Sequence, residues 1–193
     1  ASPDPDIRKA GVNYLIDILK AMEKVGSKSL VGAMYSYWPC QFEITDKEAA
    51  WERSIEGMKE VAEAAESLGI ECCQEVLNRY ETYIITDCRE GLEYCRRVGS
   101  ENVNLLLDTF HMNIEEDNIP EAIRLAGRKL GHLHVGESNR KLPGMGSLPW
   151  RDIGRALRDI GYEKGVVMEP FLLQGGEVAR DCKVLERFKW ECR

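Results

Sequence analysis

Five short and almost wholly apolar runs alternate with amphipathic helical segments along this 193-residue chain. The runs begin at residues 29, 70, 103, 130 and 165 and read SLVGAMYS, IECCQEVL, VNLLLD, LGHLHV and GVVMEPF. Strands that read as continuous apolar runs are typical of a parallel sheet covered on both faces, and a helix in each connection makes the crossover that parallel pairing requires. The sequence therefore predicts an α/β protein.

The helical segments carry start and stop signals. Ser2 is predicted to cap the first helix, with Pro3 at the first helical position. Thr45 and Glu48 have capping-box spacing before a second helix, which Gly69 is predicted to end. Further helices are predicted around DCREGLEYCRRVG, from Asn118 to Lys129, and around WRDIGRALRDIG.

Composition limits the class of protein. A chain that is 44% hydrophobic can bury one sizeable core, so we expect a single globular domain over residues 1–193. A net charge of −7 without a basic cluster disfavours nucleic acid as a partner. No apolar stretch approaches the roughly 20 residues that span a bilayer, and the first residues do not read as a leader, so we expect a cytoplasmic protein without a membrane partner.

The seven cysteines do not form a CxxC pair or another spacing typical of a metal or redox site. Cys72 and Cys73 are neighbours in an apolar run, where successive side chains point to opposite faces. They are predicted to pack as small hydrophobic residues.

Four of the five apolar runs end in a potential metal ligand. These residues are Glu75, Asp108, His134 and Glu169. A lone acid at a strand end is more often a helix cap or a salt-bridge partner. Four together favour a shared site, because the carboxyl ends of parallel strands meet at one mouth. Three carboxylates with one imidazole suit a hard divalent ion such as Mn²⁺ or Mg²⁺, with Co²⁺ tolerated.

Some features leave alternatives. His132 and His134 are predicted to share one face of their strand. His134 is favoured as the ligand because it lies nearer the carboxyl end of the strand. His132 is expected to be hydrogen-bonded deeper inside. The aromatics of YSYWP could form a pocket wall or anchor a loop. The GMG around Met145 is predicted to lie in a loop without the strand-to-helix setting of a phosphate cradle.

Several motifs resemble one enzyme family. QEVLNRYE, LLLDTFHMNIEED, GHLHVGESNRKLPGMGSLPW and VVMEPF are similar to the D-tagatose 3-epimerase family, which includes the D-psicose (D-allulose) 3-epimerases. The resemblance runs from about SPDPDIRKAG through VVMEPF, with the motifs in family order. It implies a xylose-isomerase-like TIM barrel with one divalent metal, most often Mn²⁺ or Co²⁺, on the four strand-end residues. It also implies dimers or tetramers.

The resemblance further implies that Glu81, His111 and Arg140 bind the hydroxyls and carbonyl oxygen of a ketohexose. The expected reaction is epimerisation at C3, between D-fructose and D-psicose or between D-tagatose and D-sorbose, through an enediolate that the metal stabilises. Two acid/base groups on opposite faces are needed, and Glu75 and Glu169 are the candidate pair. Without the motif, Arg140 would read as a surface residue and Glu81 as a cap.

The chain also departs from the family pattern. A complete eight-stranded barrel has about 250 residues. The five strand candidates indicate a partial barrel in which the first three βα units are absent, and the tail DCKVLERFKWECR departs from the usual continuation. The alternatives left open are an aldose–ketose isomerase of the hydroxypyruvate or xylose type, a metal-dependent phosphodiesterase, and an inactive partial barrel. Three histidines and a charge of −7 count against the phosphodiesterase.

Overall fold

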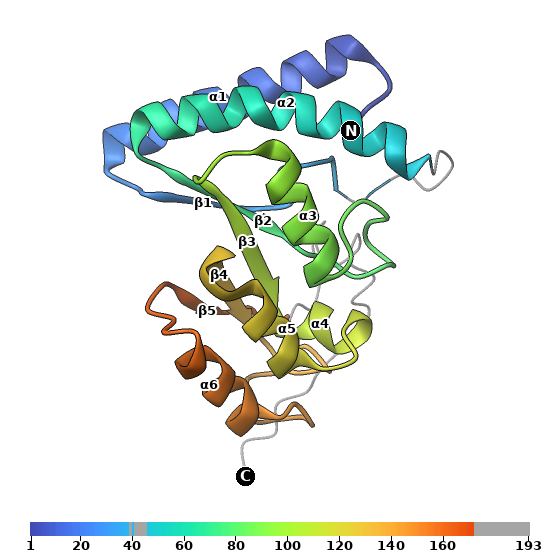
Figure 1. Cartoon of the computed structure of the whole chain (residues 1–193), viewed down its shortest axis with the longest axis vertical. Helices are drawn as coiled ribbons and strands as arrows, with labels where there is room; N and C mark the ends of the chain where they lie inside the picture. The colour runs from blue at the N-terminus through green and yellow to red at the C-terminus, as the bar shows by residue number, and fades with distance from the viewer. Residues whose placement is uncertain (39, 41–45, 172–193) are drawn as a thin grey trace.

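The computed structural model describes residues 1–38, 40 and 46–171, which form a parallel sheet with helices around it (Figure 1). The five strands are β1 (Ser29–Gly32), β2 (Glu71–Glu75), β3 (Val103–Asp108), β4 (Leu130–Val135) and β5 (Val166–Met168). The helices are α1 (Pro5–Val25), α2 (Lys47–Leu68), α3 (Cys88–Val98), α4 (Thr109–Glu115), α5 (Ile119–Ala126) and α6 (Trp150–Asp159), with a 3₁₀ turn, η1 (Gly127–Lys129), after α5.

The strands lie in the sheet in the order in which they occur in the chain, and every neighbouring pair is parallel. Helices α1, α2, α3, α5 and α6 follow one another around the sheet, each packing against the next (Figure 1). This arrangement confirms the predicted α/β class with parallel pairing. It also brings the carboxyl ends of β2, β3, β4 and β5 to one mouth.

Burial decreases from the middle of the sheet to its edge. All six residues of β3 are buried, as predicted for a strand covered on both faces. In β5, by contrast, Val166, Val167 and Met168 are 51%, 46% and 62% exposed. The expectation that every strand is covered on both faces is therefore wrong for β5 in the described residues, because this strand lies at the sheet edge and pairs only with β4.

The first helix begins two residues later than predicted. Asp4, not Ser2, is the N-cap, and its carboxylate accepts hydrogen bonds from the backbone N–H groups of Asp6 and Ile7. Pro5 takes the first helical position instead of Pro3. The sequence SPDP offers the cap-and-proline pattern twice, and the charged carboxylate of Asp4 interacts more favourably with the helix dipole than a hydroxyl does.

The predicted ends of the other helices are largely confirmed. Gly69 ends α2 in the left-handed conformation, with φ of 63°, which a glycine adopts without strain. Thr45 lies outside the described residues, and the observed N-cap of α2 is Asp46, which accepts from the N–H of Ala49. Asn118 caps α5, whose α-helical part ends at Ala126 before the 3₁₀ turn.

The two adjacent cysteines pack as predicted. Cys72 and Cys73 are fully buried, and burial raises the pKa of their thiols to about 11 and about 12. His132 lies one alternation deeper on β4 than His134, with the two ring centroids 5.3 Å apart. The expected hydrogen bond of His132 is not found among the described residues. No helix within the described ranges is both long and apolar enough to span a bilayer.

Candidate active site

Four potential ligands project from the ends of four consecutive strands. Glu75 is the last residue of β2 and Asp108 the last of β3, whereas His134 is the next-to-last residue of β4 and Glu169 follows β5. Asp108 and His134 are direct partners in the β3–β4 register. The structure thus brings together all four residues that the strand-end pattern predicted.

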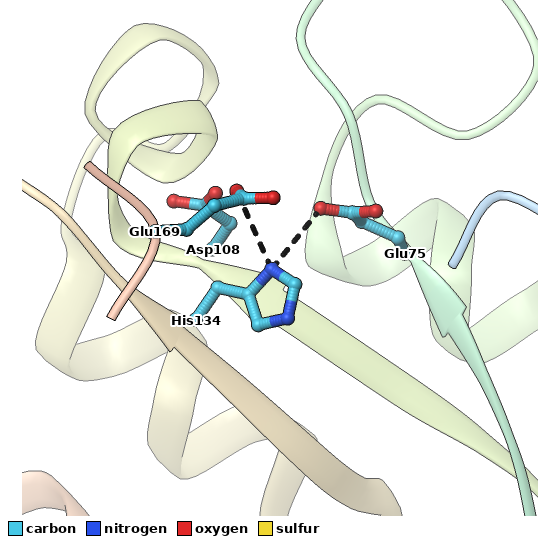
Figure 2. Close-up of side chains that lie close together, drawn as sticks. All are labelled: Glu75, Asp108, His134 and Glu169. Carbon is cyan, nitrogen blue, oxygen red and sulfur yellow. Dashed lines mark ion pairs between the residues drawn. The ribbon is translucent and has the colours of Figure 1, made fainter. Parts of the chain in front are cut away.

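Figure 2 shows His134 between two groups of carboxylates, with Glu75 on one side and Asp108 and Glu169 on the other. The Nδ1 atom of His134 lies 3.5 Å from Glu75 Oε1 and 3.4 Å from Glu169 Oε2. One ligand atom from each of the four residues lies within 4.8 Å of all the others. The cluster is therefore compact enough for its members to share one bound group.

The arrangement fits a divalent cation. His134 Nδ1 is buried and has no hydrogen-bond partner among the described residues, because both neighbouring carboxylates stand beyond good hydrogen-bond length. Two ligands on opposite sides of an ion with bonds of about 2.1 Å lie about 4.2 Å apart, close to the observed spread. Oxygen donors with one imidazole nitrogen suit Mg²⁺, Mn²⁺ or Co²⁺. The residues at this mouth can therefore hold such an ion.

Electrostatics at the cluster favour positive charge at its centre. Burial would lower the pKa of His134, but the carboxylates of Glu169 and Glu75 raise it to about 10. Burial raises the pKa of Asp108 against the opposing effect of His111 and Arg140. Burial acts in the same direction on Glu169, but His134 and Asp108 outweigh it and hold the pKa of Glu169 below its usual range.

Glu81 and His111 lie beside the cluster and are joined through Asn78. The Asn78 side-chain amide donates to Glu81 Oε1 at 2.8 Å, and its backbone N–H donates to His111 Nδ1 at 3.2 Å. His111 Nδ1 thus accepts from a backbone N–H, and its Nε2 lies 3.1 Å from the guanidinium Nη2 of Arg140. Asn78 was not predicted from the sequence. The available signal was an amide three residues before Glu81 in the same loop.

Arg140 is buried, not a surface residue, with 8% of its area exposed. Its Nη1 donates to Asp108 Oδ2 at 2.9 Å and to Glu169 Oε2 at 3.1 Å. The guanidinium lies against two aromatic rings, with its Cζ 3.8 Å from the centroid of Phe110 and 4.5 Å from that of Phe171. Arg140 therefore contacts two of the four clustered carboxylate and imidazole side chains directly, which sequence reasoning did not predict.

A cavity of about 280 Å³ opens beside these residues. It is lined by members of the cluster together with Glu81, His111 and Arg140, and by Trp38, whose indole Nε1 donates to Glu81 Oε2 at 3.0 Å. The sequence left open whether the aromatics of YSYWP form a pocket wall or anchor a loop, and Trp38 forms part of the pocket wall. A larger hollow of about 570 Å³ between α1, β1 and α2 is mostly apolar, and the described residues that line it include no carboxylate or imidazole, so size alone does not identify the reactive site.

Residues 1–188 match the family described as xylose isomerase-like TIM barrel. The chain belongs to the xylose isomerase-like TIM barrel family. Its five parallel strands are consecutive strands of such a barrel, which confirms the predicted fold class. Active sites of TIM barrels lie at the carboxyl ends of the strands, where Glu75, Asp108, His134 and Glu169 meet.

Curated members of this family resemble the chain closely. It is 53% identical over 185 residues to a D-psicose 3-epimerase from Ruminiclostridium cellulolyticum, a match that covers 95% of this chain and 63% of the relative. It is 45% identical to a D-psicose 3-epimerase from Agrobacterium fabrum, covering 95% of this chain and 64% of that protein. The predicted family resemblance is thereby confirmed.

Solved structures agree with this relationship. A D-psicose 3-epimerase with D-tagatose from Clostridium cellulolyticum superposes with a TM-score of 0.94 at 52% identity, covering 96% of this chain and 64% of that one. A D-psicose 3-epimerase crystallised in the presence of D-fructose gives 0.94 at 45% identity, covering 96% and 65%. The chain thus spans less than two thirds of the length of these xylose isomerase-like relatives.

Proposed function

We propose that this chain carries the active site of a metal-dependent ketose 3-epimerase that acts on ketohexoses, interconverting D-fructose and D-psicose or D-tagatose and D-sorbose. The observation that carries the proposal is the cluster of Glu75, Asp108, His134 and Glu169, whose ligand atoms lie within 4.8 Å of one another at a cavity. Relatives at 45–53% identity are D-psicose 3-epimerases, which supports the same reaction class. Because the chain spans only part of their length, the activity of the whole protein is part of the proposal.

The positions of Glu75 and Glu169 suit an epimerisation. Inverting C3 of a ketose requires removal of the proton next to the C2 carbonyl and its return to the other face. The two carboxylates approach His134 from opposite sides (Figure 2). In the proposed reaction one carboxylate accepts the C3 proton and the other returns a proton from the opposite side. A divalent cation bound at the cluster supplies Lewis-acid stabilisation of the charge that develops on the substrate oxygens.

We assign sugar binding to Glu81, His111 and Arg140, which line the cavity with the cluster. Glu81 offers carboxylate oxygens to hydroxyl groups, His111 offers its imidazole ring, and Arg140 offers planar guanidinium donors. Asn78 and Trp38 both donate to Glu81 and thereby fix its orientation. The hydroxyls and the carbonyl oxygen of a ketose supply the complementary acceptors and donors.

The identity of the metal, the partners, the cellular location and the oligomeric state are part of the same proposal. We assign Mn²⁺ as the cation, with Co²⁺ or Mg²⁺ as alternatives, because carboxylates dominate the donor set. The substrate is a free sugar, and the charge of −7 disfavours nucleic acid as a partner. We further propose that the protein is cytoplasmic and forms a homo-oligomer, either a dimer or a tetramer.

Proton exchange into the sugar tests the function. The chain is incubated with Mn²⁺ in D₂O and D-psicose, D-fructose or D-tagatose, and NMR identifies the labelled carbon and the product. Deuterium at C3 together with the C3 epimer is expected, and Glu169→Gln should abolish both. Deuterium at C1 or C2 with an aldose product would instead establish an isomerase. Absence of exchange with all three sugars would overturn the assignment for this chain.

A further inference from the structure

The carboxylate of Glu137 is completely buried in the loop that follows β4. Its Oε1 accepts from the backbone N–H of Gly144 at 2.7 Å and from the indole Nε1 of Trp150 at 2.5 Å, and its Oε2 accepts from the N–H of Leu148 at 3.2 Å. All three donors are neutral N–H groups from the far half of residues 138–150. A buried carboxylate needs hydrogen-bond donors, and these three N–H groups place the far half of the loop around Glu137.

The loop is built closely around this carboxylate. A Cβ added at Gly146 would overlap Glu137 Oε2, so no other residue fits there without displacing the carboxylate. The backbone on the near side is fixed as well, because the N–H of Arg140 donates to the Glu137 carbonyl at 2.9 Å and the N–H of Glu137 donates to the Lys141 carbonyl at 3.0 Å. The GMG motif therefore serves the Glu137 carboxylate, not a phosphate group.

Arg140 lies in the middle of this enclosed segment. It has a φ of 57°, a conformation that costs a non-glycine residue free energy and persists where surrounding contacts enforce it. From this backbone position its Nη2 reaches within 3.1 Å of His111 Nε2, and its Nη1 reaches Asp108. Arg140, which we assign to sugar binding, thus projects from a segment that Glu137 holds in two ways. Its backbone bonds hold the near side of the loop, and its carboxylate holds the far side.

We propose that Glu137 is a positioning residue, which holds the loop in the one conformation that directs Arg140 into the active site. An effect of Glu137 on sugar binding rests on the proposed function, whereas its effect on the position of Arg140 does not. Removing the carboxylate charge leaves the N–H groups of Gly144 and Leu148 and the indole of Trp150 with a poorer acceptor, so the far half of the loop is held less tightly around Arg140.

The ionisation of Glu137 agrees with this role. Burial alone would raise the pKa of its carboxyl group, but the donors from Trp150, Gly144 and Leu148 outweigh burial and hold the pKa below its usual range. The group is therefore an ionised acceptor at neutral pH.

The test compares Glu137→Gln with Gly146→Ala, which displaces the carboxylate without removing it. Gly154→Ala is the matched control, because among the described residues a Cβ there would meet only Arg158 Nη1, at 3.7 Å. Trypsin cleavage after Lys141 reports the order of the loop. The ¹⁵N NMR signals of the His111 ring report the position of Arg140, with Arg140→Ala as the reference for its loss. The chain has three histidines, so the ring signals can be assigned by substitution.

We expect Glu137→Gln and Gly146→Ala to raise cleavage after Lys141 severalfold and to shift the His111 signals in the direction seen with Arg140→Ala, while Gly154→Ala matches the unaltered chain. Trp150→Phe, which removes one donor only, should give a smaller change of the same kind. Unchanged His111 signals in folded Glu137→Gln would overturn the proposal, whether or not cleavage increased.

Measurements of sugar binding test whether Glu137 also affects the proposed function. With Mn²⁺ present, Glu137→Gln should weaken D-fructose binding about tenfold, and should weaken it no further when Arg140→Ala is already in place. A fully additive double variant would show that Glu137 does not act through Arg140. If the unaltered chain binds no ketose while the His111 signals still respond, the proposed function fails and the positioning role stands.

Discussion

The two ends of the parallel sheet both collect charged side chains, but only one of them balances its charges internally. At the amino end, Glu71 accepts hydrogen bonds from Lys164 and, at 2.5 Å, from Asn104. Lys129 pairs nearby with Glu101 at 3.3 Å. Each of these two acids thus has a lysine partner, and both pairs line a polar hollow of about 390 Å³ together with Asn102, Asn104 and Arg128.

At the carboxyl end, three carboxylates converge on one imidazole. Glu75 and Glu169 flank His134, and Asp108 is fully buried beside them. Arg140 is the one Lys or Arg that forms an ion pair with these acids in the described part of the chain, and it pairs with only two of them. Excess negative charge, rather than the mere presence of acids, therefore distinguishes the candidate cation site from the structural ion pairs at the amino end.

The comparison is tested most strongly by the same acid-to-amide change at each end. Asp108→Asn should lower Mn²⁺ affinity by more than about 100-fold, because even outer partners of metal ligands change affinity 10–100-fold. Asparagine can still cap α4 in place of Asp108, so the fold should persist. Titration calorimetry measures the affinity. Glu71→Gln is the control, and a comparable loss of Mn²⁺ affinity in that variant would refute the distinction between the two ends.

The pH dependence of stability tests the buried carboxylate of Glu137, which lies in the loop next to the candidate site. The pKa of folded Glu137 lies below its ordinary value of 4.5, so the group stabilises the fold above pH 4.5 and that stabilisation is lost as pH falls through the folded pKa. Glu137→Gln should lower the unfolding free energy by about 1–3 kcal/mol near neutrality. The difference should shrink in acid, as measured by urea unfolding at successive pH values. A difference that grows in acid would contradict this sign.

The pocket wall should contribute a smaller effect. Trp38→Phe keeps an aromatic ring but removes the indole N–H that donates to Glu81. We expect the KM for D-psicose to rise severalfold with kcat little changed, because the lost bond only orients a sugar-binding group. Steady-state kinetics with Mn²⁺ separates the two constants. A fall in kcat at constant KM would place Trp38 in the chemical step instead.

The smallest effect is expected at the amino end. Lys164→Met removes the cation beside Glu71, but the Lys164 side chain is 43% exposed, and exposed ion pairs contribute about 1 kcal/mol or less. Thermal unfolding should shift slightly while Mn²⁺ affinity stays at the wild-type value. Reduced metal affinity would mean that the two ends of the sheet are coupled.

The clustering of the four strand-end residues was predictable from the sequence because it depends on regular geometry. Strand-end residues of a parallel sheet share one edge whatever the loops do, so Glu75, Asp108, His134 and Glu169 follow from the apolar runs alone. The roles of Glu81, His111 and Arg140 came instead from a family resemblance. Their proximity to the cluster agrees with that resemblance, while their roles stay predictions.

Residues that depend on loop closure were not predicted. Asn78 and Glu137 act through hydrogen bonds to groups up to 33 residues away in the chain, and no periodic pattern marks such contacts. The shift of the first N-cap from Ser2 to Asp4 has a local cause, since both positions satisfy the same rule. The exposure of β5 depends on its neighbours in the sheet, which the apolar run itself does not specify.

The distribution of one ligand to each of four successive strands also bears on how the chain assembles. Glu75 and Glu169 lie 94 positions apart in sequence, so the proposed cation site is complete only after β2 to β5 have all joined the sheet. A metal that binds only the assembled sheet stabilises it by mass action, by about 2.7 kcal/mol at a concentration 100 times its Kd. The same ion would then be a folding ligand, and a chelator would loosen the weakly covered β5 edge first.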